Sequence, residues 1–240
     1  MKVIHIAGFS NSGKTTFISA LIPELKKLGT VGVVKHIGHH GYSLAEGKDT
    51  TRFFSAGAAA SAGIDAQKSV LILQENNLEQ VLEIFCDSGI EYAVVEGFKE
   101  RPSPKIIIGE VPEAENVLLR DPSIEDVLSH LEEFSDIFTP EGLSKEIRRS
   151  CGAGMTTLIS TIAIKGSSLK KQIPDLREEL YEKVSELGDV SVRLEYSGTI
   201  EPGTPEKLIM GIYASDPGMV ITAALIATDH LHPQITGKGG

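Results

Sequence analysis

A glycine-rich stretch near the N-terminus has the residue types and spacing that bind nucleotide phosphates. Residues 8–15 read GFSNSGKT and match the pattern G-x-x-x-x-G-K-[ST]. Glycines let the backbone fold around an anion, and the positive end of a following helix attracts it. Lys14 is expected to reach the outer phosphates, and the Thr15 hydroxyl to ligate Mg²⁺. The residues predicted to bind nucleotide in this P-loop are Gly8, Asn11, Ser12, Gly13, Lys14, Thr15 and Thr16.

Nucleotide hydrolysis or transfer also needs a second acid that organises the metal, and Glu96 is the candidate. Glu96 follows two valines, a position where an acid also occurs for solubility alone. Because a P-loop is present, we predict that Thr15 and Glu96 hold Mg²⁺ and that Lys14 and Glu96 are catalytic. No residue is clearly a base that positions water, so we expect slow hydrolysis.

Lys35 and a group of histidines follow the second predicted strand. Lys35 and His36 are predicted to lie near the phosphates or a second anionic ligand. His36 also forms an H-x-x-H-H cluster with His39 and His40, for which anion contact, solvent exposure and metal binding remain open. As metal ligands, these histidines lack the companion cysteine or acid spacing of a standard zinc site.

Four more charged residues are candidates for lining the same cavity. Arg52 is a candidate catalytic arginine finger supplied in cis, although surface helices carry many arginines. Lys48 and Asp49 precede it, and Asp49 could serve only as a helix cap. Lys99 lies in a locally basic segment after Glu96, which suits an anionic ligand and equally a solvated loop.

Composition excludes several classes of protein. The chain has 240 residues, 41% of them hydrophobic, so it can bury an ordinary core. A net charge of −10, 5% aromatic residues and no Trp disfavour a nucleic-acid-binding surface. No apolar run approaches the roughly 18 residues of a membrane span and no signal-peptide layout is present, so we expect a cytoplasmic protein. The two cysteines form no CxxC pair, and Cys86 is expected to be buried.

Strand and helix patterns alternate along the first part of the chain. Strands are predicted at 3–7, 30–35, 58–64, 70–73, 92–96, 105–108 and 117–119, and helices at 15–28, 49–54, 78–88 and 124–134. This alternation predicts an α/β fold of the P-loop NTPase type, a mostly parallel sheet with helices on both faces. Ligands of such sheets bind at the carboxyl ends of the strands, where the candidate residues lie.

The character of the sequence changes near Ser150. An apolar stretch at 156–164 precedes a helical pattern at 174–187, a half-exposed strand at 190–196, a second strand at 208–214 and a helix at 220–231. We therefore predict a nucleotide-binding domain over residues 1–149 and a smaller α+β domain over residues 150–240.

Residues 1 to about 135 resemble the molybdopterin-guanine dinucleotide biosynthesis protein B family. The matching stretches are GFSNSGKTT at 8–16, LIPEL at 21–25, VKH at 34–36 with His39 and His40, GKDT at 47–50, AGA at 56–58, VEGFK at 95–99 and PKI at 104–106. Their ordered combination is far more specific than the P-loop alone. One departure is GYSL at 41–44, where many relatives carry an acid after the histidine pair.

The resemblance implies a GTP-binding protein with weak GTPase activity that helps to attach a guanine nucleotide to molybdopterin. Its implied cofactors are GTP and Mg²⁺, with molybdopterin as a further ligand. Its implied partners are a guanylyltransferase of the cofactor pathway, molybdopterin-carrying enzymes and a second copy of the chain. The metal of the cofactor, molybdenum or tungsten, stays open.

Residues 151–240 resemble the large subunit of molybdopterin synthase. The similarity lies in CGA at 151–153, EYSGTI at 195–200 with Pro202 and Gly203, and residues 223–231. The lysine-rich end of that family is replaced by LHPQ at 231–234, so the resemblance implies a binding or assembly module without sulfur transfer.

Two other functions remain open from the residues themselves. The chain has no N-K-x-D motif, so the preferred base is not visible. A small-molecule kinase would use the P-loop with ATP and the histidine loop as acceptor site. A non-catalytic carrier would use the nucleotide only to control docking.

Overall fold

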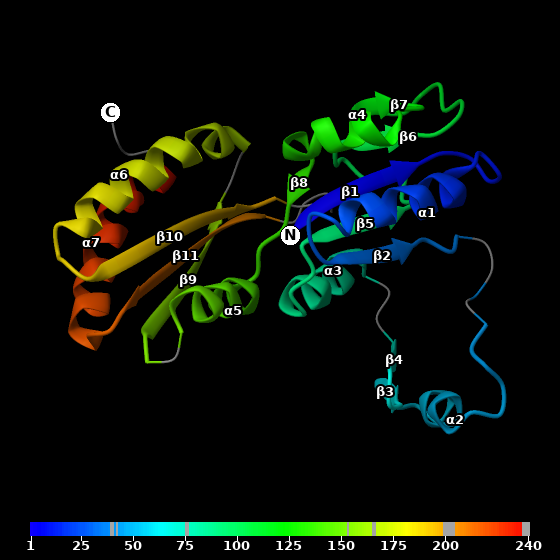
Figure 1. Ribbon diagram of the computed structural model, residues 1–240, viewed down its shortest axis with the longest axis horizontal. Coiled ribbons are helices and arrows are strands. Elements are labelled where there is room, and N and C mark those ends of the chain that lie inside the picture. The colour runs from blue at the N-terminus through cyan, green and yellow to red at the C-terminus, as the bar shows by residue number, and fades with distance from the viewer. Residues whose placement is uncertain are drawn as a thin grey trace.

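The computed structural model describes residues 1–38, 41, 43–74, 77–152, 154–164, 167–198 and 205–236. Figure 1 shows an α/β unit that contains the N-terminus, an arm that projects from it, and a second unit built on a separate sheet. Among the described residues, no helix is long and apolar enough to cross a membrane.

The main sheet is centred on β1 and has the strand order β2-β5-β1-β6-β7, with β8 beside β1. All neighbours along this order are parallel, and only β8 is antiparallel. The mostly parallel sheet predicted from the sequence is therefore confirmed. The strands are β1 (Lys2–Ala7), β2 (Val31–Lys35), β5 (Tyr92–Glu96), β6 (Lys105–Ile107), β7 (Val117–Arg120) and β8 (Ser135–Asp136).

Helices cover both faces of this sheet because the buried strands are apolar on both sides. The helices are α1 (Lys14–Leu25), α3 (Leu78–Asp87) and α4 (Ile124–Ser129), with the short 3₁₀ helix η1 (Leu131–Glu133) after α4. Ile4 and Ile6 of β1 pack in one core with Leu21 of α1. Val3 faces the opposite core, where it packs with Leu82 and with Cys86, which is buried as predicted.

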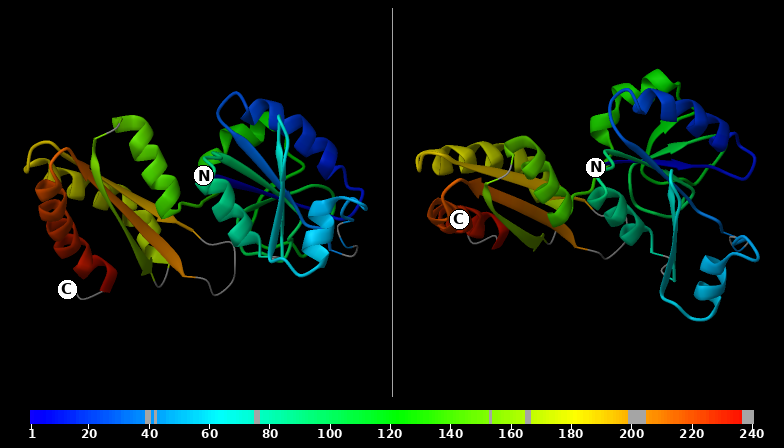
Figure 2. Two further views of the ribbon diagram at one scale, coloured as in Figure 1. Left: turned by 90° about the horizontal axis from the view of Figure 1, so that it is seen from below. Right: turned by 60° about the horizontal axis from the view of Figure 1, so that its bottom comes forward.

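The arm consists of α2 (Asp49–Ser55), β3 (Ala60–Ile64) and β4 (Ser69–Leu73) and projects away from the main sheet (Figure 2). Within the described chain, β3 and β4 pair only with each other, as an antiparallel hairpin. The turn is tight because the Asp65 carboxylate accepts hydrogen bonds from the backbone N–H groups of Gln67 and Lys68. A connection this short excludes a parallel crossover between β3 and β4, and the hairpin forms a separate two-stranded sheet.

The second unit is a three-stranded antiparallel sheet of order β10-β11-β9. Its strands are β9 (Thr156–Ile164), β10 (Val190–Ser197) and β11 (Glu206–Ala214). Its helices are α5 (Pro140–Cys151), the 3₁₀ helix η2 (Ser167–Gln172), α6 (Ile173–Ser185) and α7 (Pro217–Thr236). The helices α6 and α7 cover one face, where Leu180 and Ala223 share a core with Leu194 and Met210.

The predicted domain border at 149/150 falls inside α5, a helix that the sequence pattern did not predict. Leu143 and Ile147 of α5 pack on Ile209 of β11, on the face of the sheet opposite α6 and α7. Gly211 provides the flat spot for this contact, since a Cβ there would lie 2.7 Å from Ile147 Cδ1. The helix therefore packs on the sheet of the second unit, and its Lys145 ammonium also donates a hydrogen bond to the Asp87 carbonyl oxygen of α3.

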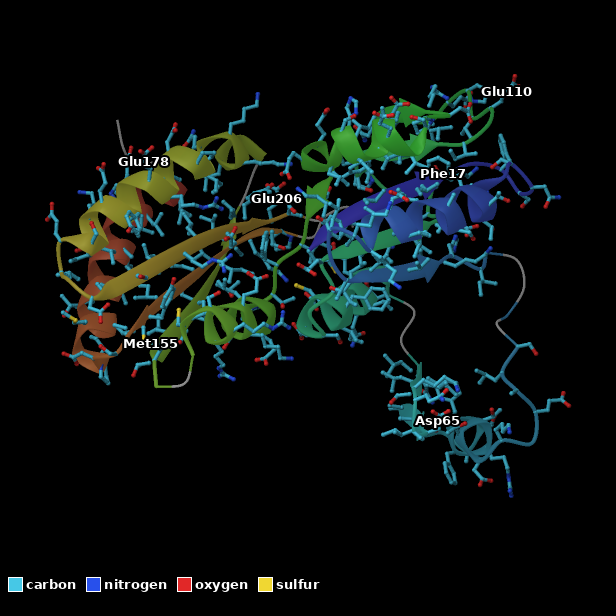
Figure 3. The ribbon with its side chains drawn as sticks, viewed as in Figure 1. Phe17, Asp65, Glu110, Met155, Glu178 and Glu206 are labelled. Atoms are coloured by element: carbon cyan, nitrogen blue, oxygen red, sulfur yellow. The ribbon has the colours of Figure 1, made fainter. Side chains whose placement is uncertain are left out.

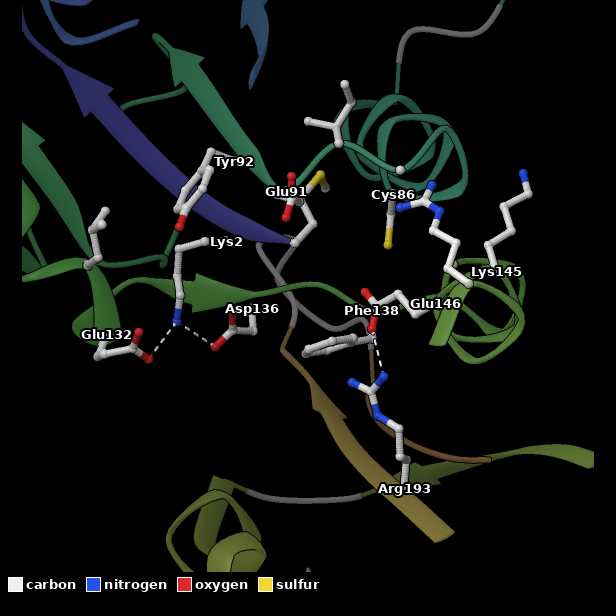
Figure 4. A pocket seen from close by; sticks show the side chains of 16 residues that line it. Lys2, Cys86, Glu91, Tyr92, Glu132, Asp136, Phe138, Lys145, Glu146 and Arg193 are labelled. Atoms are coloured by element: carbon white, nitrogen blue, oxygen red, sulfur yellow. Dashed lines mark hydrogen bonds and ion pairs between the residues drawn. The ribbon is translucent and has the colours of Figure 1, made fainter. Parts of the chain in front are cut away.

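A cavity of about 420 Å³ lies between the two units at the amino ends of the main strands (Figure 4). Lys2 pairs there with Glu132 at 3.3 Å and Asp136 at 2.9 Å, and Arg193 pairs with Glu146 at 3.0 Å. The two pairs of Lys2 lie within the α/β unit, and the pair of Arg193 with Glu146 joins β10 to α5. Because β1 begins at Lys2 and leads to the P-loop at its other end, the cavity and the P-loop lie at opposite ends of the sheet.

Candidate nucleotide-binding site

The P-loop connects the end of β1 at Ala7 to the start of α1 at Lys14. Gly8 is required by a close approach, since a Cβ there would lie 2.3 Å from the carbonyl oxygen of Ile108. Gly13 has a φ of +92°, in the left-handed region that glycine adopts without strain. In the described chain, no side chain caps the first turn of α1 and no acid lies in it. The N–H groups of this helix end are thus available to an anion.

Lys14 is folded back over the loop. Its ammonium donates hydrogen bonds to the carbonyl oxygens of Gly8 at 3.1 Å and Phe9 at 2.6 Å. Both acceptors belong to the P-loop itself, so the ammonium lies within the loop, where the phosphates would bind. Phosphate oxygens, being charged acceptors, would compete well for the same donors.

Glu96 and Lys35 lie side by side at the carboxyl ends of β5 and β2. The parallel register pairs the two residues, and the Lys35 ammonium lies 3.1 Å from a carboxylate oxygen of Glu96. The Lys35 side chain is largely exposed, whereas that of Glu96 is mostly buried. Lys35 therefore contacts the candidate metal-organising acid, and an anion that drew Lys35 away would free this carboxylate.

The two residues after Glu96 form a strained turn that sequence reasoning did not single out as a site. Phe98 has a φ of +48°, which is rare for a bulky side chain. Its ring stacks on His36 with ring centroids 4.3 Å apart. Gly97 has a φ of +100°, and a Cβ there would lie 2.6 Å from Cβ of His36. In the sequence, only the match of VEGFK at 95–99 to the family pattern indicated that this turn could belong to the site.

These groups line one cavity of about 890 Å³ at the carboxyl ends of the strands. Its predicted members are Gly8, Asn11, Ser12, Gly13, Lys14, Thr15, Thr16, Lys35, His36, Glu96 and Lys99. Its further members are Phe9, Ser10, Gly38, Gly97, Phe98, Glu100 and Arg101, the last of which belongs to the locally basic segment after Glu96 that was expected to suit an anionic ligand. The volume suits a small-molecule ligand.

Lys48, Asp49 and Arg52 do not line this cavity. They lie on the arm, where Arg52 pairs with Asp49 at 3.5 Å and both side chains are about three-quarters exposed. Figure 3 shows the tip of the arm at Asp65 well away from α1 at Phe17. After β2 the chain enters the arm, whose first element is α2, and does not return directly to the sheet. The expectation that these three residues line the P-loop cavity is therefore wrong for the single chain.

The histidine cluster is only partly visible. His36 stacks on Phe98, whereas His39 and His40 lie outside the described residues, as does Tyr42. In the part of the chain that the structure describes, no group of three or more His, Cys, Asp or Glu side chains could hold a metal ion.

A buried polar layer lies beneath the loop that carries Lys99. His5 of β1 contacts the Ser103 hydroxyl through Nδ1 at 2.7 Å and the Gly97 carbonyl oxygen through Nε2 at 2.6 Å. Since a carbonyl only accepts, Nε2–H donates to Gly97 and the Ser103 hydroxyl donates to Nδ1. Lys105, also buried, donates to the carbonyl oxygens of Lys99 and Arg101. Both side chains thereby hold residues 97–105 against the sheet.

Burial lowers the pKa of His5 from 6.5 to about 4. Between these values the unfolded chain binds more protons than the folded chain, so His5 makes stability fall as the pH falls from 6.5 to 4. The contribution reaches about 3 kcal/mol at the low end. In urea unfolding, the free energy of unfolding of wild type is expected to fall as the pH is lowered across this range, and that of His5→Asn is expected to fall less steeply. His130→Asn, which removes a half-exposed histidine that bonds to the Asp126 carbonyl oxygen of its own helix, should keep the wild-type slope. A His5→Asn slope equal to that of wild type would contradict the assignment.

Comparisons with known proteins were made for the whole chain. A family model described as Molybdopterin guanine dinucleotide synthesis protein B matches residues 3–142. A "Probable molybdopterin-guanine dinucleotide biosynthesis adapter protein" of Bacillus subtilis is 37% identical over 110 residues, 44% of this chain and 64% of the relative. A "Molybdopterin-guanine dinucleotide biosynthesis adapter protein" of Haemophilus influenzae is 33% identical over 110 residues, 44% of this chain and 62% of the relative. The chain thus matches less than two thirds of the length of these relatives.

The crystal structure of Bacillus subtilis MobB is 27% identical and covers 55% of this chain and 98% of its own, with a TM-score of 0.46. The family match ends at residue 142, near the start of α5. The resemblance of residues 151–240 to the large subunit of molybdopterin synthase stays a prediction.

Proposed function

Because the chain belongs to the molybdopterin guanine dinucleotide synthesis protein B family, we propose that it binds GTP with Mg²⁺ and serves as an adapter when a guanine nucleotide is attached to molybdopterin. The observation that carries this proposal is the single cavity that joins the P-loop to Glu96. The adapter role follows the names of the relatives in Bacillus subtilis and Haemophilus influenzae. A guanylyltransferase of the pathway is the partner that such an adapter needs.

The residues present fit a magnesium–nucleotide complex. The uncapped end of α1 suits the phosphates, and Thr15 and Glu96 are the oxygen donors that would hold Mg²⁺. The bound metal would supply charge neutralisation on the phosphates. Lys14 would bind the outer phosphates, and Lys35 would move from Glu96 toward them.

Hydrolysis is expected to be slow. Glu96 is paired with Lys35, and Arg52, the candidate arginine finger, lies on the arm outside the cavity, where it cannot neutralise charge in the transition state. Calorimetric titration of GTP and ATP with Mg²⁺ is the direct test of the binding proposal.

We also propose that the arm pairs two copies of the chain. Ile64 and Leu71 lie on the same face of the hairpin and are 82% and 53% exposed. Exposed apolar side chains on a projecting two-stranded hairpin are typical of an association surface. A second copy of the arm, which is itself apolar, is the simplest matching surface.

The double variant Ile64→Asp with Leu71→Asp is therefore expected to be monomeric at concentrations where wild type is a dimer. Each copy would bury two charges in the interface, which would weaken association at least about tenfold, since each charge costs more than 1 kcal/mol to desolvate. Sedimentation equilibrium measures the effect, with Gln67→Asp at the exposed turn as the matched control. A dimer unchanged by the double variant would place the interface elsewhere.

A further inference from the structure

A second cavity of about 390 Å³ adjoins the P-loop cavity. The two share a wall made of Phe9, Lys99, Glu100 and Arg101. The remaining lining comes from Lys105 and from the segment 111–115 between β6 and β7. The proposed phosphate-binding residues Lys14 and Thr15 do not line the second cavity. A ligand bound in this cavity would nevertheless lie next to a nucleotide on the P-loop.

The walls of this second cavity are supported from below. Val111 packs on Ala7 and Ile107, which fixes the segment 111–115 to the sheet. The Arg120 guanidinium donates a hydrogen bond to the Val111 carbonyl oxygen at 3.4 Å. On the opposite side, the buried Lys105 ammonium holds the backbone of Lys99 and Arg101. The cavity is thus built between two anchored segments.

Its lining combines an aromatic ring, cations and carboxylates. Phe9 is 55% exposed, and the Lys99 ammonium lies 5.6 Å from the centre of its ring. Glu113 and Glu115 are exposed and line the second cavity but not the P-loop cavity. A flat ring could stack on Phe9 with its phosphate toward Lys99 and the P-loop. The carboxylate of Glu113 or Glu115 would accept two parallel N–H groups from the other edge of that ring.

We propose that the second cavity binds a 2-amino-4-oxopyrimidine ring that carries a phosphate toward the P-loop. This ring edge presents a ring N–H beside an exocyclic amine, which Glu113 and Glu115 can accept. Guanine and pterin share it, so either a guanine nucleotide or a phosphorylated pterin is a source. The inference rests on the proposed function, because that function brings both molecules to this chain.

The test is calorimetric titration of the full chain with 6-hydroxymethylpterin phosphate and, separately, with GTP and Mg²⁺. The double variant Glu113→Gln with Glu115→Gln keeps side-chain size and removes both charged acceptors. Glu110→Gln, from the same segment but outside the cavity, is the matched control (Figure 3). Circular dichroism and thermal unfolding confirm that the variants are folded.

A fall of at least tenfold in pterin affinity, with GTP affinity unchanged, would place the pterin in the second cavity. A similar fall in GTP affinity, with no effect on the pterin, would place the guanine base there. Unchanged affinity for both would overturn the proposal. Lys14→Ala separates this result from the proposed function: if GTP binding does not depend on Lys14, the P-loop proposal fails whatever the pterin does.

Discussion

Replacing Lys14 by alanine is expected to abolish GTP binding. The ammonium now bonds to carbonyl oxygens of the loop and would exchange them for charged phosphate oxygens. Hydrogen bonds to charged groups contribute about 1.5–3 kcal/mol each, so losing two of them weakens binding at least about 100-fold. Titration of wild type and Lys14→Ala with GTP and Mg²⁺ measures the difference.

The matched control is Lys26→Ala, which removes an exposed lysine just after α1 and should bind GTP as wild type does. Titration with ATP tests the nucleotide itself. Tight GTP binding with much weaker ATP binding supports the proposed function. A preference for ATP would favour the small-molecule kinase, and phosphate transfer to an added acceptor would then be the next measurement. Binding that survives in Lys14→Ala would remove the P-loop from the proposal.

The sequence predicted the central part of the site because local motif and chain order act together there. The P-loop places Lys14 by its own backbone conformation. The alternation of strands and helices predicts a parallel sheet, and a parallel sheet brings the ends of β1 and β5 to one edge. Glu96 thus comes beside the P-loop without any long-range information. The pairing of Lys35 with Glu96 depends on strand register, which the sequence does not display.

The arm shows where this reasoning stops. Lys48, Asp49 and Arg52 follow β2, the strand that carries Lys35, and they have suitable charges. Their position depends on whether the β3–β4 hairpin joins the main sheet, and this is decided by tertiary contacts that no local pattern encodes. Helix α5 was missed for a related reason: its apolar stripe at Leu143 and Ile147 is short, and acidic and basic residues surround it.

The buried polar layer could not be predicted for a third reason. His5 and Lys105 occupy positions in strands that are mostly apolar. His5 belongs to no recognised motif, and Lys105 matched the family pattern only as part of PKI at 104–106, which does not indicate a buried ammonium. Their partners are backbone carbonyl groups of residues 97–101 and the Ser103 hydroxyl, which sequence alone does not place. The positive φ of Phe98 is likewise imposed by its surroundings.

Glu96→Gln is expected to change GTP affinity in opposite directions with and without the metal. Glutamine keeps the shape of the side chain but loses the charge that Mg²⁺ requires, so affinity in the presence of Mg²⁺ should fall about tenfold or more. Lys35 loses its ion-pair partner at the same time and becomes free to contact phosphate. Affinity measured in EDTA should therefore stay equal or rise. A misfolded variant would lose affinity under both conditions, and Glu24→Gln on the surface of α1 should change neither.

The same variant separates a catalytic role from a carrier role. A carrier that needs nucleotide only for docking should support guanylylation with Glu96→Gln and fail with Lys14→Ala. Equal loss in the two variants, measured in an assay that contains molybdopterin and the guanylyltransferase, would refute the carrier. The carboxylate of Glu96 is mostly buried beside the P-loop, and Lys35 is its ion-pair partner in the structure. Mg²⁺ can replace the exposed Lys35 ammonium beside this carboxylate, and we therefore expect guanylylation to fall in both variants.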